Sequence, residues 1–252
     1  YPGDTLSARS EVIGLKENSN GKTGVVYVRS TGLNQRGEMV LDYVRWVMVR
    51  KRDETASAPT PTIPDLPGAV GVTDFVVPPL SDPPSYDAAL AGSNHLWDDY
   101  SVGERIDHVD GMTIEEAEHM IATRLYQNTA KVHFNLHEQQ SSRFGKRLIY
   151  GGHIISMARS LSFNGLANAF KIAALNGGAH TNPTFASDTI YAWSEVLDKM
   201  ELPGNDNVGA LRLRTVACKD TACAEFPDKG EDGKALSAVV LDLDYTVLMV
   251  RR

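Results

Sequence analysis

The sequence predicts an α+β fold that contains two tandem copies of one unit, each with a long antiparallel sheet wrapped around a central helix. The first observation is internal repetition: the block Asp4–Ile13 reappears as Asp188–Leu197, and the block Val40–Arg52 reappears as Val240–Arg252. Matched blocks in the same order indicate a duplicated structural unit. The second observation is that the later copy reads as helical patterns followed by several strand-like segments.

Composition limits the possible functions. At 252 residues the chain has room for two modest domains, and 42% hydrophobic with 23% charged residues is ordinary for a globular protein. A net charge of −7 argues against a nucleic-acid partner. No apolar run approaches the ~20 residues that span a bilayer, so no membrane partner is predicted. Cys218 and Cys223 lack metal-ligating neighbours; we interpret them as reduced thiols of a cytoplasmic protein and predict no metal site.

Residues 1–52 are predicted to be the C-terminal sheet part of the first repeat. Three stretches rich in β-branched and aromatic residues, at about 5–16, 23–33 and 38–52, are separated by turn residues. Short connections join antiparallel neighbours and cannot make a parallel crossover. The three stretches therefore predict an antiparallel meander.

Residues 53–94 form a predicted linker. Its repeated prolines remove backbone donors and fix φ, which favours a semi-rigid segment packed along the surface. These prolines are Pro59, Pro61, Pro64, Pro67, Pro78, Pro79, Pro83 and Pro84.

Residues 95–252 are predicted to be a complete second repeat. Thr113, with Glu116 three residues later, predicts a capping box for a first helix that ends near Tyr126. The apolar residues at helical spacing in this helix are Ile114, Ala117, Met120, Ile121 and Leu125. A second, mostly apolar helical pattern begins after Gly151-Gly152 and stops near Asn164-Gly165. Strand-like segments follow at about 168–175, 188–201, 208–220 and 237–251.

A long sheet and a single apolar helix bury each other when the sheet curls around the helix, which is the hot-dog arrangement. Two copies in tandem predict a double hot-dog fold. The repeat offset leaves about 90 residues of the first repeat, with its central helix, missing before Tyr1. We expect that N-terminal segment to exist, as a separate or cleaved piece or as further chain.

The chemistry-bearing residues lie in one stretch. It contains Tyr126-Gln127-Asn128-Thr129, then His133, then Gly151-Gly152-His153 where the second helical pattern begins. This arrangement resembles the MaoC-like, (R)-specific enoyl-CoA hydratase family, whose motif places an aspartate and a histidine ahead of a glycine that opens the central helix. On that motif His133 matches the histidine, Gly152 matches the glycine, and Asn128 stands where the aspartate is usual. Over its whole length the chain resembles the mesaconyl-CoA hydratases within this family.

The resemblance implies a hydro-lyase that reversibly adds water across the double bond of a 2-enoyl-CoA thioester. Coenzyme A would be part of the substrate, and no separate cofactor is expected. His133 would act as the base for water. The N–H groups of Gly151 and Gly152, at the positive end of a helix dipole, would receive the enolate oxygen. Asn128 would orient water or substrate. The candidates for holding the rest of the substrate are Tyr126, His153, Arg143 and Arg147.

The asparagine at position 128 has a possible electrostatic reason. Mesaconyl-CoA carries a carboxylate next to the reacting carbon, and two like charges ~4 Å apart repel by about 4 kcal/mol at an effective dielectric of 20. We hypothesise that Asn128 removes this repulsion and adds a hydrogen-bond donor.

Other functions stay open at the level of sequence. The chain could be another MaoC-like enoyl-CoA hydratase, or a hot-dog acyl-CoA thioesterase, although a thioesterase needs a carboxylate or comparable group to activate water and Asn128 supplies none. It could also be a non-catalytic CoA-binding subunit. Because hot-dog sheets have edges that can pair with another sheet, we expect a homo-oligomer.

Overall fold

The chain folds into two compact units, residues 1–67 and residues 68–252, in a computed structural model that describes residues 1–79 and 85–252. The division falls inside the stretch predicted as a linker, so the first part of that stretch belongs to the first unit and the rest to the second. Pro83 and Pro84 of the predicted linker lie outside the described residues.

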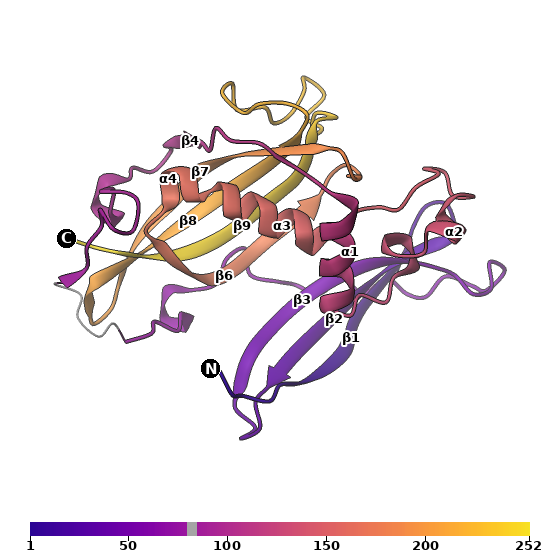
Figure 1. Cartoon of the computed structure of the whole chain (residues 1–252). Helices are drawn as coiled ribbons and strands as arrows, with labels where there is room; N and C mark the ends of the chain where they lie inside the picture. The colour runs from indigo at the N-terminus through magenta and orange to yellow at the C-terminus, as the bar shows by residue number, and fades with distance from the viewer. Residues whose placement is uncertain (80–84) are drawn as a thin grey trace. The chain divides into compact units, whose positions relative to one another are not determined.

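The first unit is a three-stranded antiparallel meander (Figure 1). Its strands are β1 (Ser7–Glu17), β2 (Thr23–Leu33) and β3 (Met39–Arg50), in the order β1-β2-β3. Asn20 makes the first turn, because its Oδ1 accepts hydrogen bonds from the backbone N–H groups of Lys22 and Thr23, each at 3.0 Å. Gly37, with φ of 78°, occupies the second turn.

The Pro-rich stretch is fastened to the sheet of the first unit. Leu15 and Thr62 exchange two backbone hydrogen bonds of 2.9 Å each. A Cβ at Gly14 would lie 2.5 Å from the carbonyl oxygen of Thr62, so glycine permits this close approach.

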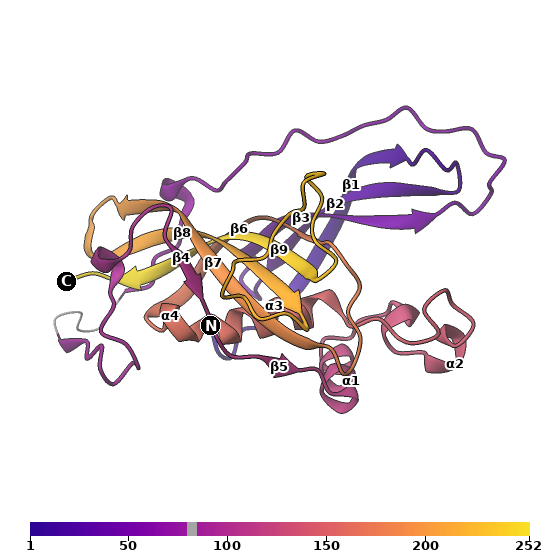
Figure 2. The same cartoon turned by 90° about the horizontal axis from the view of Figure 1, so that it is seen from above.

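The second unit contains one six-stranded antiparallel sheet and several helices (Figures 1 and 2). The sheet order is β4-β7-β8-β9-β6, and β5 also pairs with β7. The strands are β4 (Arg105–Asp107), β5 (Met112–Thr113), β6 (Ala169–His180), β7 (Thr189–Leu202), β8 (Asn205–Lys219) and β9 (Val239–Val250). The α-helices are α1 (Glu116–Leu125), α2 (Leu136–Gln139), α3 (Gly151–Leu161) and α4 (Phe163–Leu166), and the short 3-10 helices are η1 (Val72–Asp74), η3 (Trp97–Asp99) and η4 (Lys131–His133).

Helix α3 is the central helix of this unit and lies against the sheet (Figure 1). Its buried residues Ile154, Met157, Ala158 and Leu161 share one hydrophobic core with β7, β8 and β9. Burying a large aliphatic side chain contributes about 1.5–3 kcal/mol, so this helix face and the sheet stabilise each other. The helix ends at Leu161, and the chain kinks within α4 at the predicted Asn164-Gly165 pair, where Gly165 has φ of 101°.

The sequence repeat extends to side-chain contacts. In each unit a hydroxyl pair joins two neighbouring strands, and an arginine–aspartate pair joins the next two. The pairs are Ser10–Ser30 (2.8 Å) and Arg29–Asp42 (2.9 Å) in the first unit, and Ser194–Thr215 (2.6 Å) and Arg214–Asp242 (2.9 Å) in the second. Strands β1, β2 and β3 therefore correspond to β7, β8 and β9.

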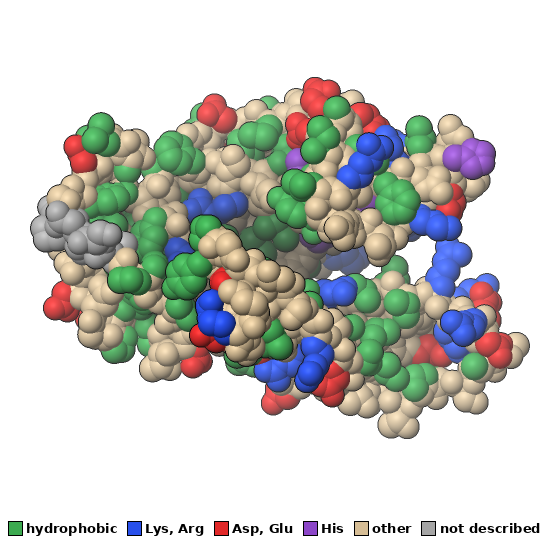
Figure 3. Space-filling model, turned by 60° about the horizontal axis from the view of Figure 1, so that its bottom comes forward, with side chains coloured by type: hydrophobic (Ala, Val, Ile, Leu, Met, Phe, Trp, Pro, Cys, Tyr) green, Lys and Arg blue, Asp and Glu red, His purple; other side chains and the backbone are tan. Residues whose placement is uncertain are grey.

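The two sheets differ in how their equivalent apolar faces are covered. In the second unit, Leu241, Leu243, Val247 and Met249 are at most 7% exposed in the core around α3. Their counterparts in the first unit are Leu41, Tyr43, Val47 and Val49, which are 37% to 55% exposed. Figure 3 shows hydrophobic side chains reaching the molecular surface in several places. Residues 1–67, all of which the structure describes, contain three strands and no helix of their own.

Two details predicted for α1 are wrong. Thr113 does not cap the helix, because it belongs to β5 and its hydroxyl pairs with that of Thr189 at 2.8 Å. The helix begins at Glu116 without a side-chain cap. Its apolar stripe is also not the buried face: Ile121 and Leu125 are 64% and 69% exposed. The buried side chains of the helix are instead the polar His119 and Thr123.

A buried polar network ties the β4–β5 connection to the kink after α3. His108 is fully buried; its Nδ1 lies 2.6 Å from the carbonyl oxygen of Asn164, and its Nε2 lies 2.8 Å from the hydroxyl of Ser194. Because a carbonyl only accepts, Nδ1 carries the proton and Nε2 accepts from Ser194. Ser194 in turn pairs with Thr215, which contacts the hydroxyl of Tyr245 at 3.1 Å.

The network predicts a pH dependence of stability. Burial lowers the pKa of His108 below its ordinary value of 6.5. As the pH falls through 6.5, the unfolded chain therefore binds a proton at this histidine before the folded chain does. The contribution of His108 to the free energy of unfolding is thus fully present above about pH 6.5 and decreases below it. In urea unfolding between pH 8 and pH 5, the free energy of unfolding should fall, by at most about 1.4 kcal/mol per pH unit for one group. His108→Gln should show a smaller fall; an unchanged slope would contradict this assignment.

Among the described residues, no helix is long and apolar enough to cross a membrane.

Candidate active site

His133 has one ring nitrogen held and the other free. It ends the 3-10 helix η4, and its Nδ1 lies 3.1 Å from the carbonyl oxygen of Leu148, in the segment that leads to α3. The carbonyl can only accept, so Nδ1 carries the proton in the neutral ring and Nε2 keeps its lone pair. Nε2 makes no hydrogen bond within the described part of the chain. His133 is therefore arranged as a base at Nε2.

Asn128 is folded into a local turn that leaves its amide NH2 group available. Its side-chain Oδ1 accepts a hydrogen bond from the backbone N–H of Ala130 at 2.9 Å. The backbone N–H of Asn128 donates to the carbonyl of Thr123 at 3.0 Å. The preceding residue, Gln127, has a left-handed φ of 50°, which turns the chain out of α1. With the carbonyl oxygen used, Asn128 offers a donor through Nδ2.

The start of α3 presents two free backbone donors. The N–H groups of Gly151 and Gly152 have no partner among the described residues, whereas that of His153 donates to the carbonyl of Tyr150 at 2.9 Å. The Tyr150 ring lies edge-on to the His133 ring, with the ring centroids 6.0 Å apart. The tyrosine therefore connects His133 to the N-terminal end of α3, where the helix dipole favours negative charge.

Glycine is required at both positions of the pair because side chains occupy the space a Cβ would take. A Cβ on Gly152 would lie 2.6 Å from the Tyr150 hydroxyl, and one on Gly151 would lie 2.4 Å from Nε2 of His180. The Gly151-Gly152 pair therefore allows close approach to the two free donors.

Substituting Gly152 tests this arrangement. Gly152→Ala should displace the Tyr150 ring and obstruct the donors at the α3 start, lowering kcat by about 100-fold, the usual effect of losing one donor of this kind. Steady-state kinetics with thermal unfolding as a folding check would measure it. Gly68→Ala is the control, because that glycine, like Gly152, has no positive φ, and no atom lies within 4 Å of its Cβ position. A Gly152→Ala enzyme as fast as the control would contradict the role of this position.

His153 and Arg147 are held by glutamates of α1. Nε2 of His153 lies 2.9 Å from Glu118, and the Arg147 guanidinium pairs with Glu116. Both side chains are only 14% exposed. The His153–Glu118 hydrogen bond and the Arg147–Glu116 ion pair fasten α1 to the start of α3 and to the segment before it. The structure thus places these two predicted substrate ligands in contacts within the protein.

Tyr126 and Arg143 lie on the surface. Tyr126 directly follows α1 and is 65% exposed. Arg143 stacks on Phe144, with its guanidinium 4.3 Å from the ring centroid, and Phe144 packs edge-on against Phe185 at 5.4 Å. The ammonium of Lys146 lies 4.1 Å from the centre of the Phe185 ring. Arg143 and Lys146 therefore contact the edge-to-face pair of Phe144 and Phe185, one ring each.

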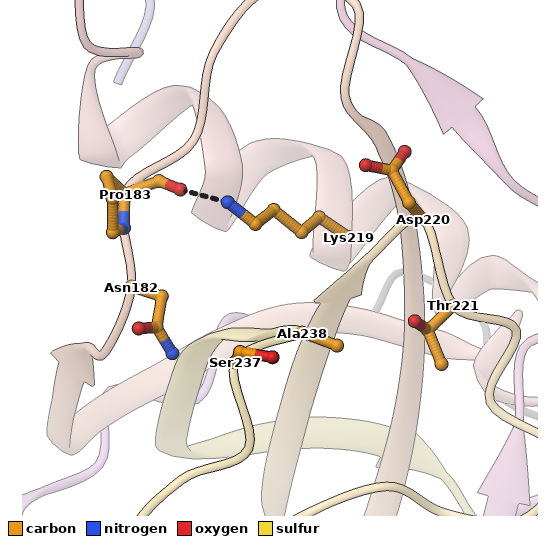
Figure 4. A pocket seen from close by; sticks show the side chains of 7 residues that line it. All are labelled: Asn182, Pro183, Lys219, Asp220, Thr221, Ser237 and Ala238. Atoms are coloured by element: carbon orange, nitrogen blue, oxygen red, sulfur yellow. Dashed lines mark hydrogen bonds between the residues drawn. The ribbon is translucent and has the colours of Figure 1, made fainter. Parts of the chain in front are cut away.

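A separate open pocket of about 440 Å³ lies beyond the ends of β8 and β9 (Figure 4). It is lined by Asn182, Pro183, Lys219, Asp220, Thr221, Ser237 and Ala238. Lys219 spans it and donates to the carbonyl of Pro183 at 2.6 Å. The pocket contains none of the predicted site residues.

His180 is the site residue that sequence analysis missed. The predicted strand stopped at about residue 175, but β6 continues to His180, whose ring touches Gly151. The repeated small residues Gly177 and Gly178 hid the continuation because glycine is unfavourable in strands. The pairing of residues 177–180 with β9 shows that the strand continues to His180.

Comparisons with known proteins match this chain throughout its length. The family model of mesaconyl-CoA hydratase matches residues 1–226. A curated relative, β-methylmalyl-CoA dehydratase of Chloroflexus aurantiacus, is 67% identical over 252 residues, and mesaconyl-CoA hydratase of Cereibacter sphaeroides is 62% identical over 251 residues. In each case the match covers 100% of this chain and 72% of the relative.

Solved structures agree with the predicted fold. A MaoC domain dehydratase from Chloroflexus aurantiacus is 66% identical, with a TM-score of 0.96 over 100% of this chain and 72% of that chain. A Mycobacterium tuberculosis protein described as a double hot-dog fold is 26% identical, with a TM-score of 0.67 over 99% of this chain and 70% of that chain. The predicted double hot-dog fold is thereby confirmed, as is the predicted enzyme class. The chain is a hydro-lyase and belongs to the mesaconyl-CoA hydratase family.

Proposed function

We propose that this chain catalyses the reversible addition of water to mesaconyl-CoA to give β-methylmalyl-CoA. The observation that supports this most is His133 near the start of α3: among residues 1–79 and 85–252, neither its Nε2 nor the N–H groups of Gly151 and Gly152 have a hydrogen-bond partner. A base and an oxyanion site are the two elements that hydration of an enoyl thioester needs. Coenzyme A enters as part of the substrate, and we propose that no separate cofactor takes part.

The proposed step begins with Nε2 of His133 removing a proton from water. The water oxygen forms its bond to C3, the C2–C3 double bond opens, and its electron pair moves onto the thioester oxygen as an enolate. The N–H of Gly152, assisted by that of Gly151, receives this negative charge at the positive end of α3. The enolate then collapses, and C2 takes the proton back from the His133 imidazolium. The reverse sequence removes water.

Asn128 is proposed to orient a substrate or water oxygen through its Nδ2 donor. Its Oδ1 is already bonded to the N–H of Ala130, which fixes the direction of the amide. An amide has no proton to exchange at neutral pH, so His133 carries the proton transfers.

The rest of the substrate is proposed to contact surface residues near this site. Arg143 is exposed and forms no ion pair among the described residues, so it is available for a CoA phosphate. Lys146 lies two residues after Phe144, on which Arg143 stacks. Tyr126 supplies an exposed ring. The binding roles first predicted for Arg147 and His153 are less favoured, because both are paired with glutamates.

Three outcomes of one assay separate the possible functions. If the proposal is right, adding mesaconyl-CoA causes loss of the enoyl-thioester absorbance without release of free thiol. Release of CoA thiol would instead indicate a thioesterase, and binding without either change would indicate a non-catalytic subunit. The lack of a titrating carboxylate at position 128 favours the hydratase over the thioesterase.

We further propose that the exposed apolar face of the first sheet is covered by a helix-bearing segment equivalent to residues 95–180 of the second unit. The contrast between Leu41 at 55% exposure and Leu241 at 1% supports this, because sheet faces of this kind are stable when buried. A homo-oligomer and a cytoplasmic location complete the proposal. The free thiols of Cys218 and Cys223 support a reducing compartment.

A further inference from the structure

His180 is a second imidazole beside the start of α3, and the mechanism above gives it no role. It is the last residue of β6 and stands opposite Leu241 of β9. Residues directly opposite in an antiparallel pair share one face of the sheet. Leu241 is buried in the core around α3, so His180 lies on the helix-facing side, although part of its side chain reaches solvent.

The ring of His180 fills the space next to Gly151. The Cβ position of Gly151 lies 2.4 Å from Nε2 of His180 and 2.9 Å from each of the two ring carbons bonded to it. Tyr150 occupies the equivalent space next to Gly152. Gly151 thus packs against an imidazole and Gly152 against a phenol. Neither ring nitrogen of His180 has a hydrogen-bond partner among the described residues.

The surroundings of His180 keep its ring neutral. Partial burial lowers its pKa from the ordinary 6.5, and positive charge on His133 lowers the pKa further. The positive end of α3 acts in the same direction. The nearest carboxylate along β9, Asp242, is paired with Arg214. At neutral pH the ring therefore keeps one N–H donor and bears no charge.

We propose that His180 is a further catalytic residue, whose neutral imidazole donates an N–H hydrogen bond to the thioester oxygen next to the N–H of Gly152. This inference rests on the proposed hydratase function. His180 makes and breaks no covalent bond and keeps its proton throughout. A neutral imidazole at a helix N-terminus suits this task, because it polarises a carbonyl without having to surrender a proton.

The test compares two substitutions in the whole chain. His180→Ala should lower kcat with mesaconyl-CoA by about 100-fold and leave KM within a few-fold, since removing one oxyanion donor typically costs about 10²–10³ in kcat. His180→Gln retains an N–H donor but cannot titrate, so it should recover about tenfold over His180→Ala. The pH–rate profile of His180→Gln should keep both limbs. His137→Ala, at an exposed histidine of α2, is the matched control.

Several results would overturn the inference. A kcat of His180→Ala close to that of wild type would remove the role. If only KM changed, His180 would instead bind the substrate carboxylate. If His180→Gln were as slow as His180→Ala and its pH–rate profile lacked one limb, His180 would instead transfer a proton. A ¹⁵N NMR titration needs no activity: a His180 ring protonated at pH 7 would contradict the neutral donor. Wild-type protein inactive on mesaconyl-CoA would count against the proposed function instead.

Discussion

His133→Ala is expected to lower kcat for hydration of mesaconyl-CoA by about 10²–10⁴-fold, the range typical for loss of a general base. The physical reason is that Nε2 carries the free lone pair, since Nδ1 is held by the carbonyl of Leu148 at 3.1 Å. In the proposed mechanism this ring both removes the proton from water and returns it to C2. Loss of enoyl-thioester absorbance measures the rate, and KM should change much less than kcat.

His137→Ala is the control for this prediction. His137 is in α2, four residues beyond His133, and is exposed, so its loss should leave the rate near that of wild type. Thermal unfolding of both variants checks that they fold. If His133→Ala retained the wild-type rate, the assignment of the base would be wrong. If both variants were equally slow, a disturbance of the η4–α2 segment would be the cause.

Asn128→Asp is expected to reduce kcat/KM for mesaconyl-CoA by about 100-fold or more. The exchange leaves the turn intact, because an aspartate oxygen can still accept from the N–H of Ala130. It replaces only the free NH2 group with a negatively charged oxygen. Repulsion from the substrate carboxylate at ~4 Å is worth about 4 kcal/mol at an effective dielectric of 20, and each 1.4 kcal/mol corresponds to a factor of ten.

A second substrate separates charge repulsion from other damage. With a short 2-enoyl-CoA that carries no carboxylate, Asn128→Asp should lose much less activity than with mesaconyl-CoA. Equal losses on both substrates would refute the electrostatic explanation. Asn135→Asp is a matched control, since the Oδ1 of Asn135 also accepts a backbone N–H, that of Glu138, at 3.2 Å.

The sequence was sufficient for the features that depend on local pattern. The three strands of the first unit begin and end within two residues of the predicted bounds, and α3 begins at the predicted glycine pair. The roles of His133, Asn128 and Gly152 remain predictions, but in the structure both His133 and Gly152 lie against Tyr150.

Features that depend on distant partners could not be predicted in the same way. The capping box at Thr113 was wrong because pairing with Thr189, 76 residues away, takes that hydroxyl. The exposed stripe of α1 has a similar origin: Glu116 and Glu118 of this helix bind Arg147 and His153 across the site. Helical spacing cannot reveal such pairings because they join separate elements.

His180 is the clearest case of a position that the sequence pattern could not predict. The β6–β9 pairing contains three register shifts, and each shift changes which residues point toward the helix. Alternation read along the sequence therefore cannot tell that His180 shares a face with Leu241.

By itself the sequence determined the duplication, the order of strands and helices, and the spacing that places a histidine ahead of a glycine-opened helix. These properties follow from repeated blocks and from local periodicity. A local turn with Ala130 sets the amide of Asn128, whereas only the tertiary structure decided the protonated nitrogen of His133 and the place of His180. The reason is that hydrogen bonds and packing between residues far apart in the chain fix where a side chain points and which of its atoms remain free.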